Sequence, residues 1–247
     1  MIRSIFISST FKDLNEERDF IRDKIGARLY EYTTENYGIG YDFMDLRIGV
    51  ENAKNKGQTI DACLSVLKES APPNPFIVII GDSWGREPDT EALNCAIEEL
   101  DDEDSDIKGY LENVRDNKLI RSYTSLEIDY GAFGLGAPEE DREKYKKRTL
   151  FIFKTRATQD NDENIVKLKE RIEADFPGQI IYMDKYGKSP LKSKRFENAV
   201  FNKLKTIIKK ANKTKLDKDR IERMLHEEYM ELKARGFYGR EEIIKDI

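Results

Sequence analysis

The stretch Ile5-Phe6-Ile7-Ser8-Ser9-Thr10-Phe11-Lys12-Asp13-Leu14-Asn15-Glu16-Glu17-Arg18 decides the fold of this chain. The start of this stretch overlaps a short apolar run, Ile2 to Ile7. The β-branched residues of that run are typical of a buried strand when a turn follows at once. Ser8 to Thr10 forms the predicted turn. Asp13 and Glu16 then have the spacing of a capping box at the start of a helix. Apolar residues recur at helical spacing after it, at Leu14, Ile21, Ile25 and Leu29.

A strand that runs through a hydroxyl-rich loop into a helix is suited to binding an anion. The first amides of a helix lack partners within the helix, and the helix dipole favours negative charge beside them. The hydroxyl groups of Ser8, Ser9 and Thr10, with Phe11 in the same loop, would then hold a phosphate or a ribose oxygen. Ser, Thr and Asp are also the commonest helix caps, so a purely structural role for these residues stays open.

Four further segments are predicted as strands and alternate with predicted helices. Phe76 to Ile80 is an uninterrupted apolar run, which is typical of a parallel strand covered on both faces. The alternation predicts an α/β fold, a five-stranded parallel doubly wound sheet of the flavodoxin-like kind, with strand order 2-1-3-4-5. The other predicted strands are residues 41–47, 149–153 and 179–182, and the predicted helices include 59–70, 124–133, 165–176 and 192–211.

Composition excludes several classes of site. The 247 residues contain two cysteines and one histidine, His226, so neither a disulfide framework nor a histidine-rich or cysteine-rich metal site is expected. A net charge of −5 argues against nucleic acid as the main partner. No apolar run is long enough to span a membrane and no signal peptide is evident, so a cytoplasmic protein without a membrane partner is expected.

Charge is unevenly distributed along the chain. Glu98 to Asp106 is almost wholly acidic and lies within an acidic helical excursion at about residues 87–121. Lys185 to Lys215 holds eleven basic residues and a single acidic one, Glu197. A run of this kind is typical of a solvated helical face, and a contact with an acidic partner is the alternative.

The predicted topology brings two loops to one place. Ligands of doubly wound sheets bind beyond the carboxyl ends of the strands, where the strand order reverses, here between the first and third strands. The loop at Ser8 to Phe11 would face the loop at Gly81 to Gly85, which offers Gly81, Ser83 and Trp84. Trp84 would stack on a nucleotide base or pack against the core.

The next helix adds a candidate catalytic residue. Glu127 lies three residues after Thr124, so it is either a capping-box residue or a carboxylate that points into the cleft, near Tyr123. A carboxylate suits the cleavage of an N-glycosidic bond because it stabilises the positive charge that builds on the sugar.

Charged residues of the first helix and the second strand complete the candidate site. Arg18 lies one turn into the first helix and would pair with Asp45 or with a ligand phosphate. Asp45 and Arg47 are further candidates for nucleotide binding, as is Tyr123 near Glu127. Asp13 and Arg18 are predicted to act structurally, in a helix cap and an ion pair.

The order of residues from Ile5 to Arg18 resembles the opening of TIR-like domains at the N-terminus of NACHT-containing proteins. Bacterial relatives of these domains are thought to act in antiviral defence. The segment Ser122-Tyr123-Thr124-x-x-Glu127-x-x-x-Gly131-Ala132 is similar to the place where NAD-cleaving TIR enzymes carry their glutamate. The resemblance implies that Glu127 is catalytic, that NAD or a related nucleotide is a substrate and not a cofactor, and that no metal is needed.

The end of the chain carries a second resemblance. Phe237-Tyr238-Gly239-Arg240-Glu241 resembles the signature that leads into NACHT and related STAND NTPases, although no Walker motif follows it. The resemblance implies a TIR-like domain at residues 1–212 and a helical extension at 213–247 that links it to an NTPase. Self-association through that NTPase would activate the domain. A non-catalytic oligomerisation or interaction module, and a nucleotide sensor without turnover, are the alternatives.

Overall fold

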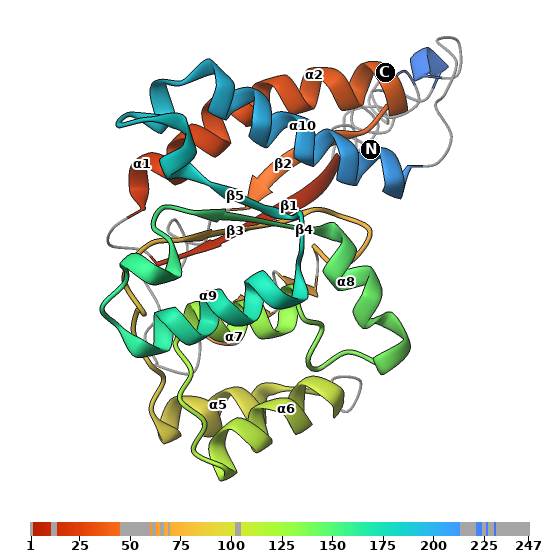
Figure 1. Ribbon diagram of the computed structural model, residues 1–247. Coiled ribbons are helices and arrows are strands. Elements are labelled where there is room, and N and C mark those ends of the chain that lie inside the picture. Colours follow the sequence, from red (N-terminus) through yellow and green to blue (C-terminus); the bar gives the residue numbers. More distant parts are fainter. Residues whose placement is uncertain are drawn as a thin grey trace, which may run out of the picture.

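The central strand of the sheet is the uninterrupted apolar run. All five residues of β3 (Phe76–Ile80) are buried in the computed structural model, because helices cover both faces of the strand (Figure 1). The structure describes residues 2–10, 14–44, 60, 63–64, 67–68, 70–101, 105–212, 221–223, 226 and 230. The sheet has the order β2-β1-β3-β4-β5, and its four strand pairings are parallel. The other strands are β1 (Ile2–Ser9), β2 (Gly40–Met44), β4 (Thr149–Phe153) and β5 (Ile180–Tyr182).

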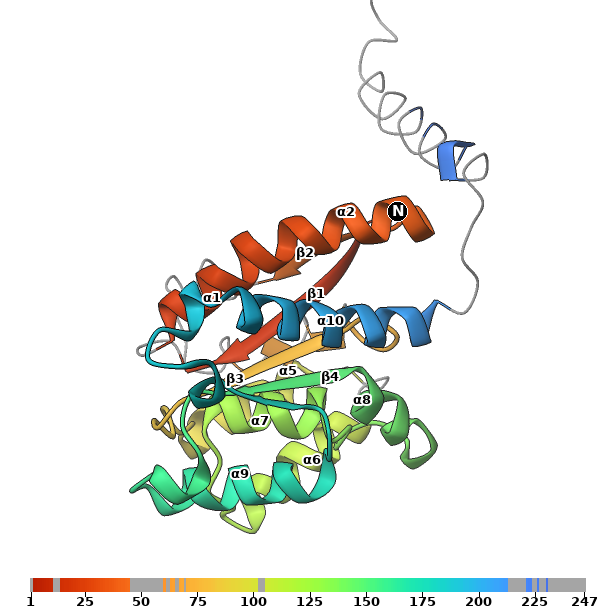
Figure 2. The same ribbon diagram turned by 45° about the horizontal axis from the view of Figure 1, so that its top comes forward.

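The helices form a layer on each face of the sheet (Figures 1 and 2). One layer consists of α10 (Lys194–Ala211) and of a long helix in which a π-helical segment, η1 (Ile21–Ile25), joins α1 (Asn15–Phe20) to α2 (Gly26–Tyr37). The other layer contains α5 (Thr90–Glu99), α6 (Ser105–Asp116), α7 (Tyr123–Gly131), α8 (Arg142–Arg148) and α9 (Glu163–Asp175). Short 3-10 segments connect several of these elements: η3 (Glu139–Asp141), η4 (Ala157–Gln159), η5 (Met183–Tyr186) and η6 (Pro190–Lys192).

Alternation along β1 divides the core into two parts. Ile5 and Ile7 pack with the long N-terminal helix and α10, whereas Phe6 packs with α5, α6, α7 and α9. Each face of the sheet therefore has its own apolar cluster. The predicted helical stripes are buried as expected, including the described residues Ile60, Cys63, Leu64 and Leu67 of the second predicted helix.

The predicted strand order is confirmed, and the predicted boundaries of the third and fourth strands are exact. The first strand was predicted to end at Ile7, which is wrong, because Ser8 and Ser9 pair with Val78 and Ile79 of β3. The second strand begins one residue earlier than predicted, and the fifth begins one residue later, at Ile180. These shifts are small. The longer first strand matters most, because it places Ser8 and Ser9 within β1 and so points their side chains to opposite faces of the sheet.

The predicted acidic excursion is helical. It consists of α5 and α6, which pack against each other beneath α7 in Figure 1. The weak apolar stripe of α5 is buried in the apolar cluster on that side of the sheet, at Ala92, Ala96 and the following Leu100. The excursion is therefore part of the folded layer and extends the core on that face.

Candidate functional site at the carboxyl edge of the sheet

Glu127 lies at the carboxyl edge of the sheet, on the side of α7 that faces β1. The N-cap of α7 is Ser122, whose side chain accepts a hydrogen bond from the amide of Ser125 at 3.2 Å. The capping-box interpretation of Thr124 and Glu127 is therefore wrong, because the N-cap lies two residues before Thr124. Glu127 is 5% exposed, and its carboxyl group is turned to the strand.

Two side chains donate hydrogen bonds to this carboxyl group. The hydroxyl of Ser8 donates to Oε2 at 2.5 Å, and the thiol of Cys63 donates to it from the helix before β3. Burial raises the pKa of Glu127, while the bonds from Ser8 and Cys63 and the charge of Arg18 partly offset this effect. A buried carboxyl with a shifted pKa at the ligand-binding edge of a doubly wound sheet is a candidate catalytic group.

Ser9 and Arg18 lie on the other face of the same strand. The guanidinium of Arg18, which is 1% exposed, donates to the hydroxyl of Ser9 at 2.5 Å, to the carbonyl of Ser9 at 3.3 Å and to the carbonyl of Ile7 at 3.1 Å. The hydroxyl of Ser9 itself donates to the carbonyl of Thr10 at 3.1 Å. The predicted structural role of Arg18 thus has a clear basis, since this side chain secures the end of β1.

Successive side chains of a strand point to opposite faces, so β1 separates the two charged groups. Ser8 faces Glu127 and Ser9 faces Arg18. The sequence pattern predicted that Ser8, Ser9 and Thr10 lie together in one anion-binding loop. The structure instead divides them, with Ser8 and Ser9 inside β1 and Thr10 directly after it.

The loop after β3 meets Thr10 and the start of α7 around a small hollow. Its lining includes Thr10, Gly81, Ser83, Trp84 and Thr124. The space in it that a water molecule's centre can occupy is about 10 Å³, which is room for a single water. The predicted meeting of the two loops is confirmed by this lining. A nucleotide is too large for the hollow and would have to lie outside it.

Trp84 and Tyr123 border the same edge. The indole N–H of Trp84 donates to Glu87 at 2.8 Å, and its ring is half-buried against the apolar cluster of α5, α6, α7 and α9. Tyr123 is half-buried against the same cluster, and its amide donates to the carbonyl of Arg86 at 2.9 Å. These contacts give both aromatic residues a packing role at the rim of the edge.

Four predicted site residues lie outside the described residues: Phe11, Asp13, Asp45 and Arg47. The predicted ion pair between Arg18 and Asp45 therefore stays a prediction. The N-cap position of α1 is Leu14, with no capping side chain, so the capping box predicted from Asp13 and Glu16 is not the cap of this helix.

The contact between Cys63 and Glu127 was not predicted from the sequence. The sequence placed Cys63 in a buried helical stripe with Ile60, Leu64 and Leu67, and the structure confirms its burial at 4% exposure. Burial, followed by the proximity of Glu127, raises the pKa of the Cys63 thiol well above its usual value. The thiol is thus held in its protonated, hydrogen-bond-donating form. Only the three-dimensional packing of this helix against α7 reveals the contact.

Asp129 is a second residue that the sequence did not indicate. It lies on α7, on the side opposite to Glu127. Its carboxylate, which is 1% exposed, accepts hydrogen bonds from Arg121, Arg171 and the hydroxyl of Tyr110, each at 2.7 Å. These partners come from α6, from the segment before α7 and from α9. The network therefore fixes the orientation of the helix that carries Glu127.

A buried ion pair lies beyond the end of β4. Lys169 of α9 donates to Asp160 at 2.6 Å and to the carbonyl and hydroxyl of Thr155 at 3.0 and 2.8 Å. Both charged side chains are fully buried, and burial lowers the pKa of Lys169. Every contact of this ammonium is accounted for by the fold, so the pair acts as a structural link between the β4 loop and α9.

Comparison with known families identifies the domain. A family model described as "Domain of unknown function (DUF4062)" matches residues 4–226. The chain is a DUF4062 protein. The match includes both sides of the candidate site, since β1 and α7 lie within it.

Curated relatives match a shorter part of this DUF4062 chain. "NACHT and WD repeat domain-containing protein 2" from Homo sapiens is 32% identical over 89 residues, and the protein of the same name from Mus musculus is 30% identical over 89 residues. Each alignment covers 33% of this chain and 5% of the relative. No solved structure matches the chain.

Among the described residues, no group of three or more His, Cys, Asp or Glu side chains is arranged to hold a metal ion. Within the same part of the chain, every helix is too short or too polar to cross a bilayer.

Proposed function

We propose that this DUF4062 domain is a TIR-like effector that cleaves NAD or a related nucleotide at its N-glycosidic bond when it is assembled. The observation that carries the proposal is the position of Glu127, buried at the carboxyl edge of the sheet and joined to Ser8 at 2.5 Å. This edge lies at the switch point between β1 and β3, where doubly wound sheets bind their ligands.

The proposed chemistry uses the carboxylate as an electrostatic group. The bond between C1′ of the ribose and the nicotinamide nitrogen breaks, and its electron pair neutralises the positive ring nitrogen. The sugar becomes an oxocarbenium ion, which a negative charge nearby stabilises. Water then attacks C1′ and loses a proton, giving ADP-ribose. Ser8 keeps the carboxyl of Glu127 oriented, and Arg18 favours its ionised form through its charge.

The larger protein is part of the proposal. The relatives carry NACHT and WD-repeat in their names, and their matched stretch is a small fraction of their length. We infer that residues 1–212 form the effector domain, with its acidic insertion at about 87–121. Residues 213–247 would lead to an NTPase whose self-association assembles the domain, in a setting such as antiviral defence.

A non-catalytic interaction module is the second candidate. Two observations favour it. Ser8 and Cys63 already donate hydrogen bonds to the carboxyl of Glu127, and the hollow beside Thr10 and Trp84 has room for one water molecule only. In that case the buried glutamate is a structural group and the domain acts through its surfaces. A sensor that binds a nucleotide without turnover would use the same edge.

The test is nicotinamide release by the chain fused to a coiled coil that forces oligomerisation. The wild type is compared with two variants, Glu127→Gln and the control Glu173→Gln. Glu173 lies on α9 and accepts a hydrogen bond of 2.9 Å from Tyr182 of β5, a strand that does not border the switch point between β1 and β3. We expect Glu127→Gln to lower turnover by about a hundredfold or more, the scale for removing a preorganised charge from an active site. The control should keep the wild-type rate.

Other outcomes point to the alternatives. An assembled wild type that leaves NAD, NADP and ATP intact would reject the hydrolase. If the same protein binds one of these nucleotides in calorimetry, the sensor is favoured, and if it binds none, the interaction module is favoured. Each variant is first shown to be folded by circular dichroism.

A further inference from the structure

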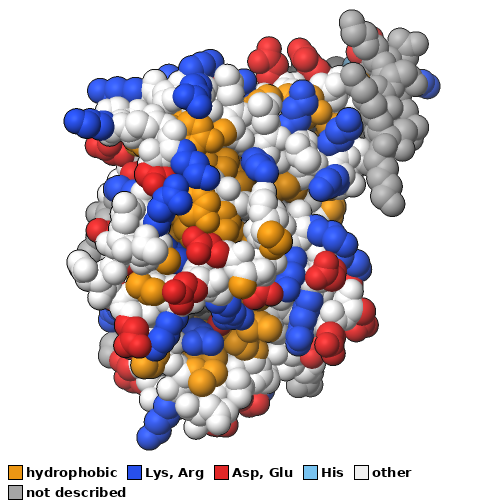
Figure 3. Space-filling view, viewed as in Figure 1, with side chains coloured by type: hydrophobic (Ala, Val, Ile, Leu, Met, Phe, Trp, Pro, Cys, Tyr) orange, Lys and Arg blue, Asp and Glu red, His pale blue; other side chains and the backbone are white. Residues whose placement is uncertain are grey.

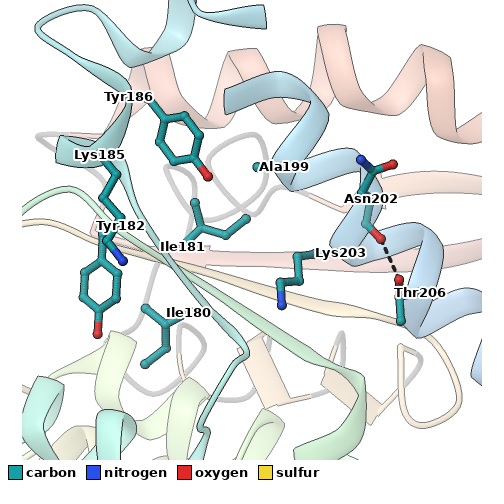
Figure 4. Close-up of a pocket in the computed structure, with 9 residues that line it drawn as sticks. All are labelled: Ile180, Ile181, Tyr182, Lys185, Tyr186, Ala199, Asn202, Lys203 and Thr206. Atoms are coloured by element: carbon teal, nitrogen blue, oxygen red, sulfur yellow. Dashed lines mark hydrogen bonds between the residues drawn. The ribbon is translucent and has the colours of Figure 1, made fainter. Parts of the chain in front are cut away.

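An open groove lies between the edge strand β5 and helix α10, far from Glu127. Figure 4 shows Ile181 of β5 and Ala199 of α10 lining it, with Lys185 and Tyr186 on one side and Lys203 on the other. The groove has a volume of about 380 Å³, which is within the range of ligand and peptide sites. β5 is the edge strand of the sheet formed by the described residues, so the groove runs along that edge.

The charge around this β5–α10 groove is positive. Lys203 donates to the carbonyl of Gly178 at 2.6 Å, and the ammonium of Lys185 lies 4.8 Å from the centre of the Tyr182 ring. Among the described residues, neither lysine forms an ion pair with a carboxylate. Figure 3 shows further lysine and arginine side chains around an apolar strip over α10. The groove therefore presents two cations that lack a carboxylate partner among the described residues, beside apolar side chains.

The opposite charge gathers at another corner of the molecule. Glu98 and Glu99 end α5, Asp101 follows Leu100, and Asp106 lies in the first turn of α6. All four are exposed, and none forms an ion pair with a described residue. We call these four residues the acidic corner. An exposed cluster of like charges without counter-ions is costly for the fold and is relieved by a basic partner.

The groove and the acidic corner cannot meet within one chain. α10 belongs to the apolar cluster on one face of the sheet, whereas α5 and α6 belong to the cluster on the other face. Figures 1 and 2 place the two helical layers on opposite sides of the strands. Any contact between the two surfaces must therefore join two copies.

We propose that the acidic corner of one copy docks into the β5–α10 groove of a second copy. The contact is heterologous, because each copy offers a different surface, so repetition builds a ring or an open filament. Exposed ion pairs contribute little and are screened by salt, so the contact by itself is weak and strongly dependent on ionic strength. Tethering several copies on one assembly raises their effective concentration and makes the same contact persistent.

Sedimentation velocity on the chain tests the proposal with charge-reversal variants. The groove variant carries Lys185→Glu and Lys203→Glu, and the corner variant carries Glu98→Lys, Glu99→Lys and Asp101→Lys. The wild type should self-associate at low salt and dissociate as the Debye length falls to about 8 Å at physiological ionic strength. Each variant alone should associate at least about tenfold more weakly, because like charges then meet at the interface.

Mixing the two variants is the decisive step. The unchanged corner of the groove variant fits the unchanged groove of the corner variant, and the two reversed surfaces also complement each other. Association should therefore return in the mixture. A control with Lys209→Glu and Lys210→Glu makes the same change of net charge at the far end of α10 and should associate like the wild type.

Several results would overturn the proposal. These are a wild type that stays monomeric at low salt, variants that associate as the wild type does, or a mixture that stays monomeric. Loss of association in the Lys209 and Lys210 control would likewise reject it, because net charge would then account for the effect. Thermal unfolding of each variant shows that the substitutions leave the fold intact. Since the readout is mass, the result is independent of whether the domain cleaves a nucleotide.

Discussion

Ser8 and Ser9 are neighbours in the sequence, yet their hydroxyl groups lie on opposite faces of the sheet, one on a carboxyl group and the other on a guanidinium. Ser8 donates to Glu127 at 2.5 Å, and Ser9 accepts from Arg18 at 2.5 Å. The end of β1 is thus held from both sides by buried charged groups. Both contacts belong to the fold whatever reaction the edge carries out, so both give predictions about stability.

We predict that Glu127→Gln stabilises the protein, and more so at higher pH. Burial raises the pKa of Glu127 above its usual 4.5, so its stabilising contribution is fully present below that value and is lost as the pH rises through the raised pKa. Glutamine keeps an acceptor for Ser8 and has no charge to desolvate. Thermal unfolding at about pH 5 and about pH 8 should show a larger gain at the higher pH. A loss of stability that grows with pH would contradict this.

Arg18→Lys should destabilise the domain by about 2–4 kcal/mol. The guanidinium reaches the carbonyls of Ile7 and Ser9 and the hydroxyl of Ser9 together, and a compact ammonium cannot reproduce this planar fork. Urea unfolding measures the change. Arg22→Lys, on the exposed side of the same helix, is the control and should cost less than about 0.5 kcal/mol. Equal effects at the two positions would refute the assignment of Arg18.

Asp129→Asn should loosen the packing of α6 and α9 on α7. The substitution removes the charge that Arg121, Arg171 and Tyr110 share, and uncompensated buried groups of this kind cost about 3 kcal/mol or more. Hydrogen exchange should show faster exchange in α6 and α9 than in α10. Asp175→Asn, which breaks a half-exposed pair with Lys146, serves as the control and should leave exchange in α6 unchanged.

Gly131→Ala should destabilise the domain by about 1–3 kcal/mol through overpacking. A Cβ at this position would lie 2.7 Å from the Phe76 ring and 2.9 Å from Leu67, closer than side chains pack in a relaxed core. Gly109→Ala in α6 is the matched control, since its Cβ would meet nothing within 4 Å. Alanine in a helix interior is favoured over glycine, so the control should stabilise the protein slightly. Chemical unfolding of both variants checks the opposite signs.

The fold was largely predictable because each buried strand is marked by its own apolar run. Phe76–Ile80 is apolar throughout, and Thr149–Phe153 is apolar after its first residue, which is β-branched. The end of β1 was not predictable, because Ser8 and Ser9 have the composition of a turn and are held in the strand by Val78 and Ile79 of β3. Tertiary pairing overrode the local preference there.

The candidate site was predictable in its position and less so in its contacts. The strand order brings Ser8 and the start of α7 to one edge, and it follows from the alternation of strands and helices. The role of Cys63 was hidden, because a cysteine in an apolar stripe gives no signal of the carboxyl group that it faces. The partners of Asp129 come from three separate segments, so their meeting depends on side-chain packing that periodicity does not encode.

The π-helical segment Ile21–Ile25 has a consequence for how this domain tolerates changes of length. Its wider turn accommodates one residue more than an α-helix would, while Arg18 before it and Leu29 after it still face the same core. Removing a single residue from the exposed side of this segment, such as Asp23, lets it close into a regular α-turn. A one-residue deletion should therefore be tolerated there, whereas the same deletion in α2 would rotate Leu29 and Thr33 out of the core.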